Sequence, residues 1–182
     1  MERIFAEENG FYALDCTKSI WATDKIHDAY HQAGFPWSDV DWVIETENDF
    51  LLVEYKNAAV PGAANPAKFD LSKGDIAEKV SRSLALKYYD SQHFLSLLQT
   101  KKPKRYICVL EFPNGDYRIR QNMCVLVSEK ILSLPGCMSP IETLEKPVES
   151  VEVLSINEWN HHPLYGRYPL RRASPAGTEN FS

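Results

Sequence analysis

One short segment constrains the fold of this chain more than any other, the run FLLVEYKNA at residues 50–58. Its first four residues are apolar, which is typical of a strand that enters a hydrophobic core. Glu54 and Lys56 then follow, although Glu and Lys are rarely buried unless they are paired. Because residues two apart on a strand share a face, both charges point to the same side of the predicted sheet. The segment therefore predicts a buried strand that ends in a charged pair.

A second strand precedes this one in the sequence DVDWVIETENDFLLVEYKNA, and the turn between them decides where Asp41 lies. A two-residue turn at 48–49 places Asp41 opposite Lys56. A four-residue turn at 46–49 places it opposite Glu54, with opposing side chains about 5 Å apart. A three-residue turn moves Asp41 to the other face of the sheet. Two of the three registers therefore bring Asp41, Glu54 and Lys56 together.

Two carboxylates at this spacing repel each other unless a positive charge lies between them. Mg²⁺ prefers oxygen ligands, and it commonly takes one or two protein carboxylates together with waters and phosphate oxygens. A neighbouring lysine can orient a metal-bound water, or it can stabilise negative charge that develops at phosphorus. Asp41 and Glu54 are thus candidate metal ligands, and Lys56 is a candidate catalytic residue.

The rest of the chain predicts one mixed α/β domain with a central sheet flanked by helices. Its length of 182 residues suits a single domain. Helical spacing of apolar residues predicts two helices, and a third segment fits either a helix throughout or a short strand followed by a helix. The predicted helices cover 17–34, ending at Gly34, and 71–100, with a break near Asp90; the predicted strands cover 104–111 and 148–156; and the ambiguous segment covers 117–137.

Composition and charge restrict the location expected for the protein and the partners it can have. No segment approaches the roughly 18 consecutive apolar residues of a membrane span. The acidic N-terminus MERIFAEENG lacks the positive start of a secretory signal, so we expect a cytoplasmic protein. The net charge of −5 argues against a protein that coats nucleic acid indiscriminately. The four cysteines show no metal-binding spacing and are expected to be reduced thiols, and nothing around Cys16 indicates a nucleophile.

An acid on one strand, followed by an apolar strand ending in Glu-x-Lys between two helices, resembles the PD-(D/E)XK nuclease superfamily. The resemblance covers about residues 17–111 and implies a restriction endonuclease-like core of helix, strands, helix and strand. Residues 112–172 are then a C-terminal extension, and 173–182 a disordered tail. The sequence departs from the family pattern in that Pro36 lies five residues before the acid and does not directly precede it.

The resemblance also implies residue roles. Asp41 corresponds to the first metal-binding acid, Glu54 and Lys56 to the Glu-x-Lys element, and the backbone carbonyl of Tyr55 to a further ligand of Mg²⁺ or Mn²⁺. Many members add an acid from the preceding helix, and both Asp24 and Asp28 remain open for that role. Asp39 is a rival of Asp41, because both have the same strand parity.

The expected function is that of a metal-dependent nuclease that hydrolyses phosphodiester bonds of DNA or RNA. DNA is the first expectation for the substrate, and the resemblance is compatible with a homodimer. Lys79, Arg82 and Lys87 are spaced at i, i+3 and i+8, close to one helix face, and are expected to contact phosphates. The alternative is an inactive nuclease-like module that binds nucleic acid or protein. The segment NEWNHHPLY at 157–165 is interpreted as aromatic packing.

Overall fold

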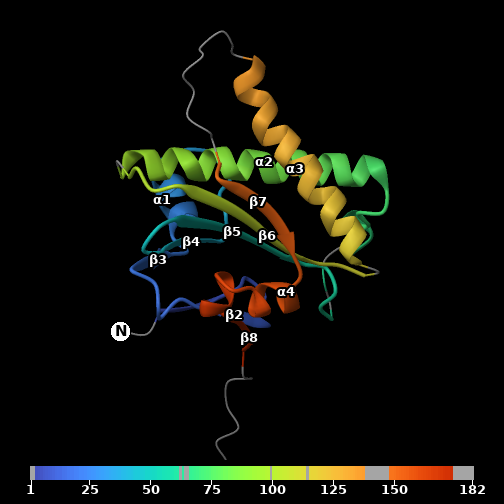
Figure 1. Ribbon diagram of the computed structural model, residues 1–182, viewed down its shortest axis with the longest axis horizontal. Coiled ribbons are helices and arrows are strands. Elements are labelled where there is room, and N and C mark those ends of the chain that lie inside the picture. The colour runs from blue at the N-terminus through green and yellow to red at the C-terminus, as the bar shows by residue number, and fades with distance from the viewer. Residues whose placement is uncertain are drawn as a thin grey trace, which may run out of the picture.

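The computed structural model describes residues 3–61, 63, 66–98, 100–113, 115–137 and 148–173, and of 134–137 it describes the backbone alone. A mixed five-stranded sheet runs through its centre (Figure 1). The strands lie in the order β3 (Trp21–Thr23), β4 (Trp42–Glu45), β5 (Phe50–Asn57), β6 (Lys104–Glu111) and β7 (Ser150–Leu154). The β3–β4 and β4–β5 pairs are antiparallel, whereas β5–β6 and β6–β7 are parallel.

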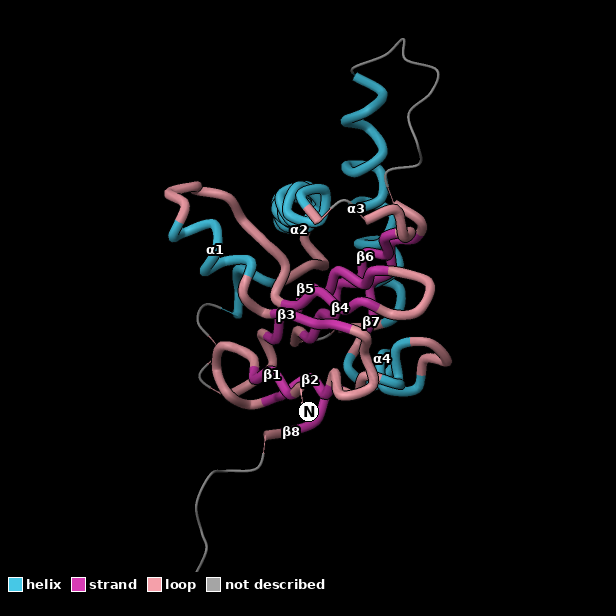
Figure 2. Tube along the Cα trace, turned by 90° about the vertical axis from the view of Figure 1, so that its left-hand side faces the viewer, coloured by secondary structure: helices cyan, strands magenta, loops and turns pink. Residues whose placement is uncertain are grey.

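Helices and a second sheet cover the two faces of this sheet (Figure 2). Three helices lie on one side, and on the other side lie a short helix and a three-stranded antiparallel sheet of order β1–β2–β8. The first group comprises α1 (Ile26–Gln32), α2 (Gly74–Leu97) and α3 (Tyr117–Cys137); the second comprises α4 (Ile156–His161), β1 (Ile4–Ala6), β2 (Tyr12–Asp15) and β8 (Leu170–Arg172). The described residues also form two 3₁₀ turns, Pro66–Phe69 and Tyr165–Arg167. The predicted α/β class with a central sheet flanked by helices is confirmed.

The parallel strand pairs explain the two long helices. Parallel neighbours cannot be joined by a tight turn, so each needs a crossover connection. Helix α2 connects β5 to β6, and α3 connects β6 to β7. Strand β6 is buried on both faces, as its apolar run predicts.

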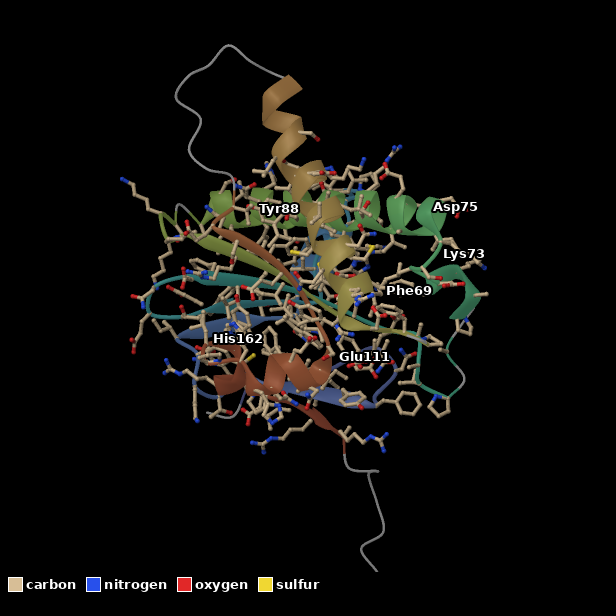
Figure 3. All side chains as sticks on the ribbon, turned by 45° about the vertical axis from the view of Figure 1, so that its right-hand side comes forward. Phe69, Lys73, Asp75, Tyr88, Glu111 and His162 are labelled. Carbon is tan, nitrogen blue, oxygen red and sulfur yellow. The ribbon has the colours of Figure 1, made fainter. Side chains whose placement is uncertain are left out.

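Two hydrophobic cores follow from this layering. The first lies between the sheet and α1, α2 and α3, where Tyr88 of α2 is fully buried (Figure 3). Tyr106 donates a hydrogen bond to the carbonyl of Leu84 in this core. The second lies between the sheet and the α4 side, and it is built around the fully buried Trp159 and Tyr165. The predicted aromatic packing of 157–165 is therefore confirmed.

The helix predictions need two corrections. The predicted helix at 17–34 is wrong for its first half, because Trp21–Thr23 forms the edge strand β3 and α1 begins only at Ile26. Gly34 does follow the helix, with a φ of +75° that favours glycine. Helix α2 is continuous through Asp90, whose carboxylate instead accepts a hydrogen bond from Ser38 N–H on the loop before β4. The ambiguous segment 117–137 is a helix throughout.

The region after residue 111 contributes to both sheets. Strand β7 extends the central sheet beyond β6, and β8 pairs with β2 from the start of the chain. The predicted tail lies outside the described residues from 174 onward. In the part of the chain that the structure describes, no helix is long and apolar enough to cross a membrane.

Candidate active site at the end of strand β5

The side chains of β5 alternate between the two cores until the strand reaches its charged end. Phe50 and Leu52 face α2, whereas Leu51 and Val53 face the α4 side. Glu54 continues the alternation toward α2 and is fully buried. A carboxylate in this position has lost its water shell, so it needs partners from the neighbouring elements.

The turn before β5 selects one of the three registers. Glu45 pairs with Phe50 and Trp42 pairs with Val53, so residues 46–49 form a four-residue turn. The hydroxyl of Thr46 accepts hydrogen bonds from the Asn48 and Asp49 N–H groups, at 3.2 and 2.9 Å, and fixes this turn.

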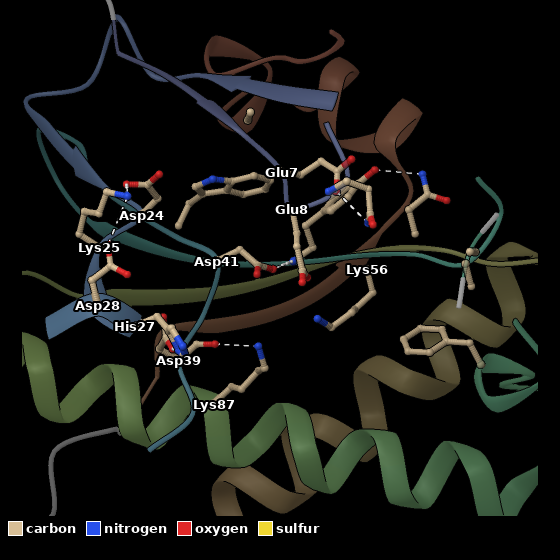
Figure 4. A pocket seen from close by; sticks show the side chains of 18 of the residues that line it. Glu7, Glu8, Asp24, Lys25, His27, Asp28, Asp39, Asp41, Lys56 and Lys87 are labelled. Atoms are coloured by element: carbon tan, nitrogen blue, oxygen red, sulfur yellow. Dashed lines mark hydrogen bonds and ion pairs between the residues drawn. The ribbon is translucent and has the colours of Figure 1, made fainter. Parts of the chain in front are cut away.

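Asp41 therefore lies one residue beyond the last ladder pair, opposite Glu54 and on the same face of the sheet. Its Oδ2 accepts a hydrogen bond of 2.6 Å from Tyr55 N–H, which fixes the position of the Asp41 carboxylate. Figure 4 shows this carboxylate among the other charged side chains of the site. The predicted antiparallel hairpin is confirmed in its four-residue form, although its first strand covers only Trp42–Glu45 and not the expected 40–46.

Two lysines approach the buried carboxylate from opposite elements. Lys56 Nζ lies 3.3 Å from Glu54 Oε1, and Lys87 Nζ, from α2, lies 3.0 Å from Oε2. Lys87 also donates a hydrogen bond of 2.8 Å to the carbonyl oxygen of Asp39. Lys87 thus connects α2, the segment that carries Asp41 and the end of β5.

The electrostatics of these groups follow from burial and from each other. Burial raises the pKa of Glu54 to about 7 and the Asp41 carboxylate adds to the rise, while Lys87 and Lys56 act against it. Burial lowers the pKa of Lys56, but Glu54 and Asp41 outweigh this effect and leave the pKa above its usual value. Without a bound cation, Lys56 is therefore held as a charged ammonium.

A cavity of about 790 Å³ opens in front of these residues. Its lining includes Asp41, Lys56 and Lys87, together with five further acids (Figure 4). Those acids are Glu7, Glu8, Asp24, Asp28 and Asp39. Among the described residues, no group of three or more Asp, Glu, His and Cys side chains is close enough to hold a metal ion. The two carboxylates that the hairpin register places opposite each other are those of Asp41 and Glu54.

The rival and helix acids have other partners. Asp39 Oδ1 lies 3.2 Å from His27 Nδ1, and burial raises the pKa of Asp39. Asp24 and Asp28 lie 3.8 and 3.4 Å from the ammonium of Lys25. Both helix acids face the same cavity as Asp41, and neither is selected over the other.

The three basic residues of α2 do not share a face, so the expected common face is wrong, and their contact with phosphates stays a prediction. Lys87 is 20% exposed and points toward the sheet, whereas Arg82 is 71% exposed and lies 3.8 Å from Glu78 on the outer side. Lys79 is exposed as well. A signal for Lys87 was present in the sequence, since it lies three residues after Leu84 and four before Ser91, both of which are buried.

Glu7 and Glu8 also line this site, although no pattern in the sequence indicates it. They enter through the turn between β1 and β2, and these strands are too short for their pattern to be recognised. Cys16 is buried, and burial raises the pKa of its thiol to about 12, which agrees with an unreactive thiol.

Comparisons with known proteins add no identification. No protein-family model matches this chain, and neither curated proteins nor solved structures give a significant match.

Proposed function

We propose that this chain is a metal-dependent nuclease of the PD-(D/E)XK type, which hydrolyses phosphodiester bonds of DNA or RNA. The observation that carries the proposal is the register of the hairpin, which puts Asp41 opposite the buried Glu54, with Lys56 Nζ 3.3 Å from the Glu54 carboxylate. The order α1, β4, β5, α2 and β6 supports it further, because it follows the helix, strands, helix and strand of that superfamily.

The donor set fits Mg²⁺ or Mn²⁺. Glu54 Oε1 is buried and makes no hydrogen bond within the described residues, although Lys56 lies nearby. Asp41, Glu54 and the backbone carbonyl of Tyr55 would hold the cation, which matches the oxygen ligands that Mg²⁺ prefers. When bound, the cation would offset the repulsion between the carboxylates and polarise a phosphate oxygen and a water.

The protein side chains have separate tasks in this proposal. Lys56 is 41% exposed and lines the cavity, so its ammonium, 3.3 Å from Glu54 Oε1, can also face a substrate there. It orients the attacking water and donates hydrogen bonds to phosphate oxygens that gain charge in the transition state. Lys87 holds Glu54 in place through Oε2 and fixes the backbone at Asp39.

Titration calorimetry with Mn²⁺, together with a cleavage assay on single- and double-stranded DNA and RNA, tests this function. We expect the parent to bind Mn²⁺ and to lose cleavage when EDTA is added. Asp41→Asn should weaken Mn²⁺ binding by about 10–100-fold or more, since even outer partners of metal ligands have effects of that size. The matched control is Asp75→Asn, at an exposed acid in the first turn of α2. Metal binding and cleavage that survive Asp41→Asn would contradict the proposal.

A second candidate function rests on the same contacts. The two lysines already compensate Glu54 without a metal, as expected for a nuclease-like scaffold that binds nucleic acid or protein without cutting. A parent protein that neither binds Mn²⁺ nor cleaves any of the four substrates would favour this alternative.

A further inference from the structure

A second cavity, of about 1230 Å³, lies beside the candidate active site. Five segments line it: the turn between β1 and β2, the residues after β5, the end of β6, α4 and the end of β8. The two cavities share Asn9 and Asn57 in their linings. Asn57 directly follows Lys56 on β5, so a chain molecule that leaves the active site can continue into the second cavity.

Hydrogen bonds hold the walls of this cavity in place. The Glu7 carboxylate accepts hydrogen bonds from the N–H groups of Asn9 and Phe11, at 2.8 and 2.7 Å, and so organises the turn that presents Phe11. Asn57 Nδ2 donates to the Tyr55 hydroxyl at 2.9 Å, and Asn57 Oδ1 accepts from Ala59 N–H at 3.0 Å. A preformed cavity avoids part of the ordering cost of binding.

The groups that remain available are aromatic and cationic. The Phe11 ring is 41% exposed, and Tyr12 beside it also lines the cavity. Arg172 is exposed and has no ion pair with the described residues, whereas the adjacent Arg171 lies 3.9 Å from Asp15. The lining also includes the carboxylate of Glu111, whose Oε1 accepts the Ile156 N–H at 2.7 Å.

We propose that this cavity binds single-stranded nucleic acid on one side of the cleaved bond, with an unpaired base against Phe11 and a phosphate at Arg172. The proposal rests on the proposed nuclease function, because that function places the scissile phosphate in the adjoining cavity. Within a duplex the faces of the bases are covered by neighbouring pairs, whereas an unpaired base can leave its face free to stack on an exposed ring, and stacking tolerates any base. DNA and RNA share this chemistry.

Fluorescence anisotropy with labelled oligonucleotides tests the proposal, with Ca²⁺ in place of Mg²⁺ to prevent cleavage. The probes are single-stranded eight-nucleotide DNA and RNA, a dinucleotide, and a blunt duplex. Arg172→Ala and Phe11→Ala should each weaken binding of the eight-nucleotide strands by about tenfold and leave the dinucleotide unaffected. Arg172→Ala should also reduce the slope of the logarithm of affinity against the logarithm of salt concentration by about one, since one fewer phosphate is neutralised.

Two matched controls separate this site from general surface effects. Arg171→Ala removes the neighbouring guanidinium, and Phe35→Ala removes a ring that is 49% exposed and lies outside the cavity lining. Both should leave the affinity unchanged. Equal losses for Arg171→Ala and Arg172→Ala, duplex binding as tight as single-strand binding, or no binding of either eight-nucleotide strand by the parent would overturn the proposal. The nuclease function is tested separately, by Mn²⁺ binding and cleavage in Asp41→Asn.

Discussion

At the residue scale, Glu54 is subject to opposing electrostatic effects. It is fully buried next to Asp41, which disfavours its charged form, and it is flanked by two ammonium groups, which favour that form. The ionised carboxylate is therefore stable only while Lys56 and Lys87 keep their positions. The two lysines differ in exposure, 41% against 20%, so Lys56 is the one that can reach a substrate in the cavity.

Replacing Lys56 should separate chemistry from metal binding. An ammonium has no lone pair for a cation, so Lys56 is not a ligand while it is charged. Lys56→Ala should lower the cleavage rate by about 100-fold or more and leave Mn²⁺ affinity largely unchanged, because effects confined to the transition state reduce turnover and not binding. Glu54→Ala should lose both. Lys101→Ala, at an exposed lysine before β6, is the control. Cleavage by Lys56→Ala at the parent's rate would show that this lysine has no catalytic part.

The raised pKa of Glu54 predicts how the stability of the metal-free protein depends on pH. Between the model-peptide value of 4.5 and about 7, the folded state keeps a proton that the unfolded state releases. The free energy of unfolding should therefore fall as pH rises through this window, by about 3 kcal/mol from this group alone. Urea unfolding from pH 4.5 to 7.5 should show a smaller fall in Glu54→Gln than in the parent. Glu47→Gln, at an exposed glutamate, is the control. If the free energy of unfolding of the parent and of Glu54→Gln depended on pH in the same way, the raised pKa of Glu54 would be contradicted.

Residue-scale features differ in how far the sequence predicts them. Glu54 and Lys56 are apparent because they end an apolar run, and strand parity places them on one face without further information. Lys87 was grouped with Lys79 and Arg82 by spacing alone, yet Lys87 lies at the edge of the buried stripe of α2 and the other two lie on the outer side. That distinction depends on which face of α2 packs against the sheet, and the spacing of the basic residues alone does not determine this face.

At the element scale, the turn at 46–49 determines whether the site exists. Turns of two, three or four residues would give three different registers. The observed register depends on the Thr46 hydroxyl, which accepts hydrogen bonds from two N–H groups and donates one to the Asp49 carbonyl. The sequence left the turn length open, because the two apolar strands fit either even-numbered register. The short strands β1, β3 and β8 were missed for a related reason, since three residues give too little alternation to be recognised.

Thr46→Val should weaken this turn. The substitution keeps the shape of the side chain but leaves the Asn48 and Asp49 N–H groups without their acceptor. Asn48 is exposed, whereas the Asp49 N–H is buried, and an unpaired buried donor costs about 1–3 kcal/mol. Thermal and urea unfolding should show this loss, and Mn²⁺ affinity should fall if Asp41 shifts from its place opposite Glu54. Thr46→Ser retains the hydroxyl and should stay close to the parent. If the valine and serine variants are equally stable, hydrogen bonding by Thr46 does not hold the register.

At the scale of the whole molecule, the central sheet separates two cores with different tasks. The core on the α2 side surrounds the carboxylates of the candidate active site, whereas the core on the α4 side joins the two ends of the chain through β2 and β8. Trp42 and Tyr55 face the second core from the hairpin itself, with ring centroids 5.7 Å apart. The hairpin is thus packed from both sides, which keeps the positions of Asp41 and Glu54 fixed.

Truncating Trp159 should test whether the second core supports the fold without taking part in the chemistry. Trp159 is fully buried, lies parallel to Tyr165 with ring centroids 5.1 Å apart, and donates a hydrogen bond of 2.7 Å to the Tyr168 carbonyl. Trp159→Ala should lower the free energy of unfolding by about 3–5 kcal/mol, since it leaves a large cavity and an unpaired carbonyl. Tyr117→Ala, at a ring that is 62% exposed, should change it by less than about 0.5 kcal/mol. The Mn²⁺ affinity of the Trp159 variant should be measured at a temperature where circular dichroism shows that it is folded. It should equal the affinity of the parent, because neither the Asp41 carboxylate nor the Glu54 carboxylate contacts this core. Loss of metal binding by the folded variant would show that the two cores are coupled across the sheet, and that the α4 side helps to position the site.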